Sequence, residues 1–390
     1  MPQTVNPVRH ITVKSGVTKG NRVEYKLNFN HRIYKPYFAS DHVTLNGSVE
    51  SAVAIAALGG MQQGLDLHIA DVVSPTFIHN QRRLVEIFTN WFPIYKKINI
   101  IASDSAQVSK PSTGRVGSFF TGGVDSFYTF IKNKPEITDL IYVHGYDVKL
   151  TDLARRAAIT AMGQAIETST GVRFIEIETN CIRIFRDYGR WGLHGHGYGL
   201  GAVARQLSDY LDRLYIPSSF DYGNLSPWGS HPDTDPLFSD ESLEIIHDGC
   251  EASRSQKIEA LGDNALALDH LRVCWERVEG AYNCGCCEKC IRTMTSLYAF
   301  GKLEKANTFP STLDPAAIHK LVIYDDSLVT FAKDNIDVLQ STGLGNTSVC
   351  NAWEHIVERP EYANKIILLL QRIRKKIRRS LSKKLPVIYR

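Results

Sequence analysis

Phe119–Phe130, with the sequence FFTGGVDSFYTF, is the stretch that decides the fold expected for this chain of 390 residues. An apolar run that includes Val116 ends at the pair Gly122-Gly123, and an amphipathic segment follows from Ser126 to Ile131. This order predicts a strand, a tight turn and a helix. Glycines let backbone N–H groups turn toward one point, and the amino end of the new helix directs its positive dipole there. The stretch therefore predicts an anion-binding loop.

The side chains of this loop favour a nucleotide. Thr121 and Ser126 add hydroxyl donors, and Asp125 can hold a Mg²⁺ ion that bridges phosphates. The lysine of the Walker motif, GxxxxGK[ST], is missing, which argues against ordinary transfer of a γ-phosphoryl group. A glycine pair alone is common in turns, but strand, hydroxyls and aspartate together favour nucleotide binding, with Mg²⁺ on Asp125. The nucleotide ligands expected from this loop are Thr121, Gly122, Gly123, Val124, Asp125 and Ser126.

Strand-like segments recur after the loop and alternate with helical ones. They cover residues 116–120, 140–143, 173–177 and 214–217. That rhythm predicts an α/β fold with a parallel, Rossmann-like sheet. Around it we expect three regions, namely a mixed α/β accessory domain at 1–112, the nucleotide domain with a cysteine cluster at 113–310, and a helical C-terminal region at 311–390.

Composition bounds the class of protein. The hydrophobic fraction of 43% is ordinary for a globular chain. No apolar run reaches the roughly 18 residues that a spanning helix needs, and the N-terminus MPQTVNPVRH lacks an apolar signal core. We therefore expect a cytoplasmic protein.

Charge is placed unevenly along the chain. Residues 361–390 hold ten Lys and Arg and one acidic residue, a net charge of +9, so the other 360 residues together carry −5. Apolar positions recur every three or four residues in this tail, at Ile366, Leu370, Ile373, Ile377, Leu381 and Leu385. A basic amphipathic helix can lie on an anionic membrane, bind a nucleic acid or dock on a protein partner. A terminal helix packed on its own domain is the alternative.

Four of the eight cysteines crowd between Cys284 and Cys290. Clustering of this kind, without a signal segment, favours a metal over disulfides. The spacing C-x9-C-x2-C-x2-C suits tetrahedral thiolate coordination of Zn²⁺. Cys286 is the surplus thiol. The expected zinc ligands are Cys274, Cys284, Cys287 and Cys290.

Further candidates follow the strands. Ligands of open α/β sheets bind beyond the carboxyl ends of the strands, so His144 and Tyr146 are positioned to meet ATP, with Tyr146 stacking on adenine. Alternatively, His144 and Tyr146 have only a structural role at the end of the strand. Arg254 and Lys257 share one face of a helix at 253–261, where both cations can meet one anion. A solvated helix face is the alternative there.

Two segments poor in apolar periodicity offer substrate contacts. One is the glycine-rich run Trp191–Gly201, in which His196 can meet phosphate or a base edge. The other, 218–260, is long for a loop in a compact domain and hence a functional candidate. Its expected substrate ligands are Asp221, His231 and Asp233, with Asp235 as a further carboxylate.

TGGVDS resembles the PP-loop, usually SGGxDS, of ATP pyrophosphatases, which cut ATP between the α and β phosphates. With the cysteine cluster downstream, the chain is similar over residues 115–300 to the 7-cyano-7-deazaguanine synthases of the queuosine pathway. The resemblance implies an adenine nucleotide alpha hydrolase-like fold and a carbon–nitrogen ligase that adenylates a purine-like carboxylate and then forms an amide and a nitrile. It also implies that Asp125, Ser126 and Lys257 are catalytic, and that His231-Pro232-Asp233 matches the family's Tyr-Pro-Asp motif.

This sequence departs from the family at several points. Thr234 stands where the motif continues with cysteine, and the family's Arg-Asn pair is not evident in HGHGYGLG. The region 1–112 and the tail have no counterpart in the housekeeping enzymes. The chain thus resembles divergent relatives found beside anti-phage systems, where the activated base is joined to a protein partner. A homodimer is a further possible assembly.

Two other functions fit the same residues. One is tRNA modification, thiolation above all, for which Cys181, Cys250 and Cys286 are spare thiols. The other is a nucleotide-binding interaction module without turnover, in which the first domain and the tail contact partners.

Overall fold

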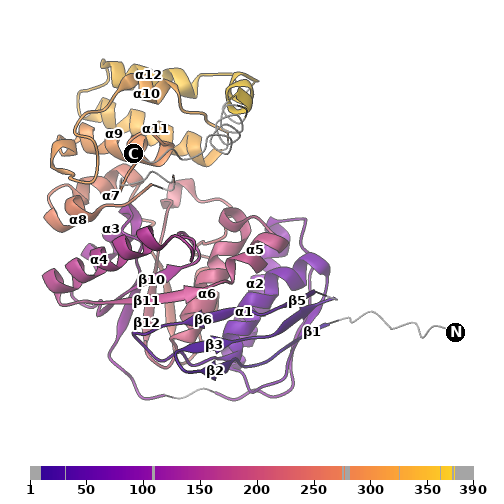
Figure 1. Cartoon of the computed structure of the whole chain (residues 1–390). Helices are drawn as coiled ribbons and strands as arrows, with labels where there is room; N and C mark the ends of the chain where they lie inside the picture. The colour runs from indigo at the N-terminus through magenta and orange to yellow at the C-terminus, as the bar shows by residue number, and fades with distance from the viewer. Residues whose placement is uncertain are drawn as a thin grey trace, which may run out of the picture. The chain divides into compact units, whose positions relative to one another are not determined.

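The computed structural model describes residues 10–30, 32–107, 110–274, 276, 282–324, 326–360, 362–370 and 373. The chain divides into two compact units, residues 1–251 and 252–390 (Figure 1). The boundaries expected near residues 112 and 310 do not coincide with this division.

A sheet of eight strands forms the centre of the first unit, in the order β13-β12-β9-β10-β11-β6-β3-β2. Its first five strands run parallel to one another. They are β9 (Val116–Phe119), β10 (Asp139–His144), β11 (Arg173–Thr179), β12 (Arg213–Pro217) and β13 (Glu244–Asp248). The four expected strands are therefore confirmed as neighbours in one parallel sheet, and the fold is mixed α/β. All six residues of β10 are buried, as in a strand with both faces covered.

β13 lies inside the segment expected to be a loop. Its sequence, EIIHD, has only two apolar residues, too few for a periodic signal. Its parallel pairing with β12, rather than an apolar pattern, holds it in the sheet.

The N-terminal region is part of this sheet and not a separate domain. β6 (Tyr37–Ala39) pairs antiparallel with β11, and β3 (Arg22–Glu24) and β2 (Val17–Lys19) extend the sheet beyond it. A smaller sheet holds β1 (His10–Val13), β7 (Asp66–Ile69) and β8 (Ile100–Ala102), all parallel. β4 (Leu27–Phe29) and β5 (Arg32–Tyr34) form a hairpin. One hydrophobic core runs through both sheets, so the chain cannot be divided at residue 112.

Helix α1 (Val49–Gln63) lies at the middle of that core beside α6 (His196–Gln206), β1 and β7 (Figure 1). Ser48 caps its amino end, and Gly64, with φ of 72°, ends it. The pair Gly59-Gly60, a common helix terminator, lies inside this helix. A Cβ at Gly59 would lie 2.4 Å from the Phe29 ring, so the glycine serves close packing inside the helix. The other helices of this unit are α2 (Pro75–Trp91), α3 (Val124–Lys132), α4 (Leu153–Thr170) and α5 (Ile182–Tyr188).

The glycine-rich run is helical and not a loop. One turn of π-helix, Trp191–Gly195, leads directly into α6. A Cβ on Gly197 would lie 1.9 Å from the carbonyl oxygen of Gly229, and one on Gly201 would lie 2.4 Å from the Phe238 ring. These glycines let neighbouring segments pack closely against the helix. A glycine-rich sequence does not by itself distinguish such close packing from mobility.

The second unit is helical in its described part. It contains α7 (Arg254–Leu261), α8 (Ala265–His270), α9 (Glu288–Ala299), α10 (Pro315–His319), α11 (Asp326–Ser341) and α12 (Ser348–Val357), and residues 362–370 are helical too. Trp353 is buried in its core, and its indole N–H donates to Thr295 Oγ1.

Most of the expected basic helix, with Ile377, Leu381 and Leu385, lies outside the described residues. Across the part of the chain that is described, a bilayer-spanning helix of sufficient length and apolarity does not occur.

Candidate nucleotide and metal sites

The loop Thr121–Ser126 joins the carboxyl end of β9 to the first turn of α3, as expected. Gly122 has φ of 72°, a left-handed value that favours glycine, and Gly123 is the N-cap of α3. Ser126 Oγ donates to the Gly123 carbonyl (3.0 Å) and accepts from the Thr121 N–H (3.3 Å). The two hydroxyls therefore lie inside the turn, 3.5 Å apart. Backbone donors, two hydroxyls and a helix amino end converge here, which is a suitable arrangement for an anion.

Asp125 and Val124 occupy the first turn of α3 but differ in exposure. Asp125 is half-buried, whereas the Val124 side chain is fully buried in the core. Val124 can therefore contribute to an ATP site through its backbone alone.

Helix α3 is fastened to the end of β13. Thr129 Oγ1 donates to Asp248 Oδ2 (2.7 Å), and Lys132 Nζ lies 2.8 Å from Asp248 Oδ1. On the same helix, four residues before Lys132, Tyr128 Oη donates to Glu251 Oε1 (2.9 Å). These contacts fix the loop's helix against β13 and the residues that follow it.

The structure holds His144 and Tyr146 in contacts within the first unit, and their contacts with ATP stay a prediction. His144 Nε2 lies 2.6 Å from Glu176 Oε1 and borders a cavity of about 400 Å³ with Glu178 and Arg156. Burial raises the pKa of Glu176, but hydrogen bonds from His144 and Thr160 outweigh it and lower that pKa.

Tyr146 packs on Trp191, with ring centroids 4.7 Å apart, and its hydroxyl donates to the Gly199 carbonyl (2.9 Å). Burial raises its pKa well above the usual value. With 8% of the residue exposed, the ring has little surface left for adenine.

The expected substrate ligands lie in the first unit but in different surroundings. Asp221 caps a short 3-10 turn and accepts from the Gly223 N–H (2.9 Å). His231 is buried edge-on against Trp91, and burial lowers its pKa, whereas the Asp233 side chain is 67% exposed. His196 Nδ1 lies 2.8 Å from the Gly192 carbonyl oxygen, and burial lowers its pKa as well.

A buried ion pair that the sequence reasoning missed lies beside this group. His247 Nδ1 is 2.7 Å from Asp235 Oδ2, and both side chains are at most 3% exposed. Burial lowers the pKa of His247, but hydrogen bonds with Asp235 and Cys250 outweigh it and raise the pKa to about 9. In the sequence Asp235 is one of several carboxylates of the segment 218–260, and His247 carries no signal because its strand has only two apolar residues.

Arg254 and Lys257 lie one turn apart on α7, as expected from their spacing. Ser253 caps this helix in a capping box with Gln256, so its amino end is fixed. Both side chains are buried, and Arg254 Nη2 lies 3.4 Å from Thr293 Oγ1. They belong to the second unit, and their approach to the loop in the first unit stays a prediction.

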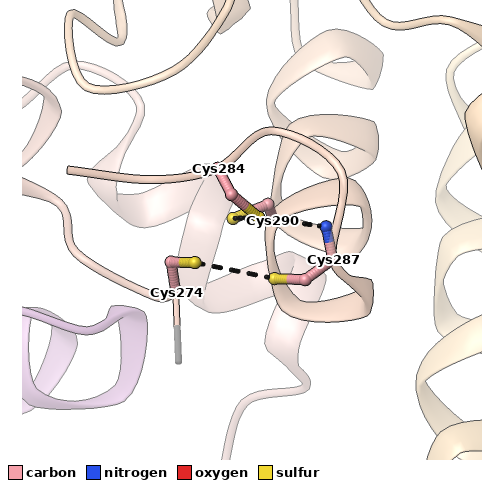
Figure 2. A group of neighbouring side chains, drawn as sticks. All are labelled: Cys274, Cys284, Cys287 and Cys290. Carbon is pink, nitrogen blue, oxygen red and sulfur yellow. Dashed lines mark hydrogen bonds between the residues drawn. The ribbon is translucent and has the colours of Figure 1, made fainter. Parts of the chain in front are cut away.

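The four expected cysteines come together in the second unit. The Sγ atoms of Cys274, Cys284, Cys287 and Cys290 all lie within 4.8 Å of one another, and their side chains converge in Figure 2. The Cys274–Cys287 pair is 3.9 Å apart and the Cys284–Cys290 pair 3.8 Å. Tetrahedral zinc, with Zn–S bonds of about 2.3 Å, places its sulfurs about 3.8 Å apart. These four thiols fit a metal ion such as zinc.

Local backbone and charge explain why the thiols need a cation. Gly285, with φ of 66°, turns the chain between Cys284 and Cys287, and the Cys287 N–H donates to Cys284 Sγ (3.2 Å). A hydrogen bond with Cys290 lowers the pKa of Cys287 to about 6, and the same contact raises that of Cys290. Thiolates this close repel one another, so full ionisation requires a bound cation. Cys286 is exposed and outside the cluster, as expected.

Comparison with protein-family models, with curated proteins and with solved structures found no match for this chain.

Proposed function

We propose that this protein is an ATP-dependent enzyme that adenylates a carboxylate, releases pyrophosphate and passes the activated acyl group to an amine. The observation that carries the proposal is the loop Thr121–Ser126 at the carboxyl end of β9, inside a parallel sheet. Ligands of open α/β sheets bind beyond the carboxyl ends of the strands. The proposal therefore takes this sheet to be Rossmann-like.

Each loop group has a role that follows from its chemistry. The Thr121 and Ser126 hydroxyls and the backbone N–H groups donate to phosphate oxygens. Asp125 holds Mg²⁺, which neutralises charge on the leaving pyrophosphate. Lys257 and Arg254 supply the cations that a Walker lysine supplies elsewhere. The substrate carboxylate oxygen attacks the α-phosphorus, and pyrophosphate leaves.

The substrate proposed is a purine-like carboxylate of the 7-deazaguanine type. The resemblance of TGGVDS and the cysteine cluster to 7-cyano-7-deazaguanine synthases supports this choice. His231, Asp233, Asp221 and His196 offer donors and acceptors for a heterocycle. A zinc ion on the four cysteines would be structural, because four sulfur ligands leave no open position for substrate.

A pyrophosphate-release assay tests the proposal. The full chain is incubated with ATP, Mg²⁺, ammonium and 7-carboxy-7-deazaguanine, with the carboxylate omitted in the reference reaction. We expect release that depends on the carboxylate and falls at least 100-fold in Asp125→Ala, since the metal ligand is lost. Asp209→Ala is the matched control, because Asp209 is an exposed carboxylate that precedes β12. It therefore lies at the amino ends of the parallel strands, away from the loop. Release that is equal with and without the carboxylate would contradict the proposal.

A further inference from the structure

The N-terminal strands carry a polar face opposite their buried one. In β1, and in the segment 22–29 that holds β3 and β4, apolar and polar residues alternate. The buried positions are at most 3% exposed, and they are Ile11, Val13, Val23, Tyr25, Leu27 and Phe29. Side chains of a strand point alternately to its two sides, so the residues between these positions face away from the core. They are Thr12, Arg22, Glu24, Lys26 and Asn28, all exposed or half-exposed.

This polar face borders a hollow of about 730 Å³, which we call the basic hollow. Glu24 is the only carboxylate among the described residues that line it, so with histidine neutral its five Lys and Arg give a net charge of +4. Residues 1–360 together carry −5, so positive charge is concentrated here against the balance of the chain. The basic side chains that line the hollow are His10, Lys14, Lys19, Arg22, Lys26 and Lys35.

Much of this charge has no counter-ion in the described part of the chain. Glu24 is shared by two cations, Lys19 Nζ at 2.8 Å and Arg22 Nε at 2.9 Å. Lys14, Lys26 and Lys35 are exposed, and none of the three forms an ion pair with another described residue. Like charges held close together repel one another, and a bound polyanion relieves that repulsion. The basic hollow is therefore suited to an anion that carries several charges.

Its shape and its neutral donors favour a strand of phosphates. The cations come from separate segments, namely β2, β3 and the residues that follow β1, β3 and β5. Exposed hydroxyl and amide groups of Thr12, Ser15 and Asn28 line the same hollow, and such groups donate to phosphate oxygens. A duplex is read by elements that protrude into its grooves, and a membrane surface is bound by amphipathic segments that insert into it. A concave basic surface instead suits a single strand.

Stacked aromatic rings lie at the border of the basic hollow. The His10 ring, which lines it, stacks on the His68 ring with centroids 4.0 Å apart and an angle of 11° between the planes. His68 belongs to β7, which pairs with β1. Bases of a single strand stack on aromatic side chains, histidine included. Phosphate-binding groups and a planar surface for a base thus occur together.

We propose that the basic hollow binds a single-stranded nucleic acid through its phosphate backbone. Lys14, Lys26 and Lys35 contact the phosphates, and the His10–His68 pair offers a base its stacking surface. The inference goes beyond the proposed function and does not depend on it, because neither ATP nor the loop Thr121–Ser126 takes part in the binding.

Fluorescence anisotropy of the full chain with a labelled 12-nucleotide oligouridylate tests the proposal. Lys14→Gln/Lys26→Gln/Lys35→Gln removes the three lysines that lack ion pairs. At about 100 mM KCl we expect this variant to bind at least tenfold more weakly than wild type. Each phosphate contact on a single strand contributes roughly 0.7 to the slope of log K against log salt, so the slope should become shallower by about 2. A second arm with oligothymidylate shows whether RNA or DNA binds more tightly.

The matched control is Lys96→Gln/Lys97→Gln/Lys134→Gln, which removes the same charge from exposed positions outside the basic hollow. Both variants keep the basic residues of 361–390, so the comparison reports the hollow alone. The control should bind within about threefold of wild type, because lysines that contact no phosphate release no counterions. Thermal melting of both variants checks that they are folded.

Several results would overturn the proposal. They are wild-type affinity in the Lys14/Lys26/Lys35 variant, an equal loss of affinity in both variants, and no binding of either oligonucleotide by the wild-type chain. Vesicles with about 30% phosphatidylserine form a membrane arm. If the Lys14/Lys26/Lys35 variant loses vesicle binding while it keeps oligonucleotide binding, the basic hollow contacts lipid and the proposal fails.

Photocrosslinking locates the bound strand. A 12-nucleotide RNA that contains 4-thiouridine is irradiated with the wild-type chain, and the crosslinked peptides are identified by mass spectrometry. We expect crosslinks within residues 10–35 and at His68, and crosslinks confined to other segments would contradict the proposal. Since no ATP is present, a chain that releases no pyrophosphate in the assay above still gives a result here.

Discussion

His247 Nδ1 lies 2.7 Å from Asp235 Oδ2, in a place where both side chains are almost fully buried. Because the pair raises the pKa of His247 to about 9, from about 6.5 in the unfolded chain, folding stability depends on pH. The stabilisation is fully present below about pH 6.5 and is lost as the pH rises through about 9. The shift corresponds to roughly 3 kcal/mol.

We expect Asp235→Asn to remove this dependence. Urea unfolding at pH 6 and pH 9.5 should show that the wild-type chain loses stability between the two values by roughly 3 kcal/mol more than the variant does. Asp233→Asn is the matched control, since that side chain is mostly exposed and two residues away. The same pH dependence in wild type and Asp235→Asn would show that the pair does not set it.

The four cysteines should bind one zinc ion per chain. Elemental analysis of the purified protein is expected to give a 1:1 ratio, and Cys287→Ser should reduce the zinc content to less than a tenth, because a hydroxyl replaces a thiolate ligand. Cys286→Ser, one residue away and outside the cluster, should keep its zinc.

A strong chelator should lower the melting temperature of the wild-type chain and leave that of Cys287→Ser unchanged. Metal binding contributes to folding where the ligands come together only in the folded state. An unchanged melting temperature for zinc-free wild type would contradict this structural role.

Gly197 should tolerate no side chain. In Gly197→Ala the new Cβ would meet the Gly229 carbonyl oxygen at 1.9 Å, so backbone must shift, at a cost of about 1–3 kcal/mol as in overpacked cores. In Gly192→Ala, in the adjoining π-helical turn, the nearest atom lies 3.6 Å away, and stability should hardly change. Thermal unfolding of both variants compares them, and equal melting temperatures would refute the packing argument.

Thr121 should be replaceable by serine but not by alanine. The hydroxyl, not the methyl group, lies inside the turn with Ser126. Titration calorimetry with a non-hydrolysable ATP analogue and Mg²⁺ should give a dissociation constant for Thr121→Ser within about threefold of wild type. Thr121→Ala should bind roughly tenfold more weakly, as expected for one lost hydrogen bond to a charged oxygen. An alanine variant with wild-type affinity would exclude the hydroxyl from the site.

The sequence by itself determined the features whose signal is local. The strand–loop–helix of TGGVDS, the four parallel strands, the helix that carries Arg254 and Lys257, and the four converging cysteines could all be predicted, because each depends on periodicity, caps or spacing within a few residues. The cysteine spacing predicted the cluster because two-residue gaps constrain where successive thiols can point.

Only the tertiary structure decided which segments complete the sheet and what the buried polar groups contact. β6 pairs with β11, and β13 pairs with β12, because the path of the chain brings each of these strands to an open side of the sheet. Short strands of mixed polarity carry little sequence signal of such a pairing. The same folding turned Tyr146 toward Gly199, packed the glycine-rich run into α6, and brought Asp235 to His247 on a strand that the sequence did not reveal. Contacts between residues far apart in the chain are set by packing, which a local pattern does not record.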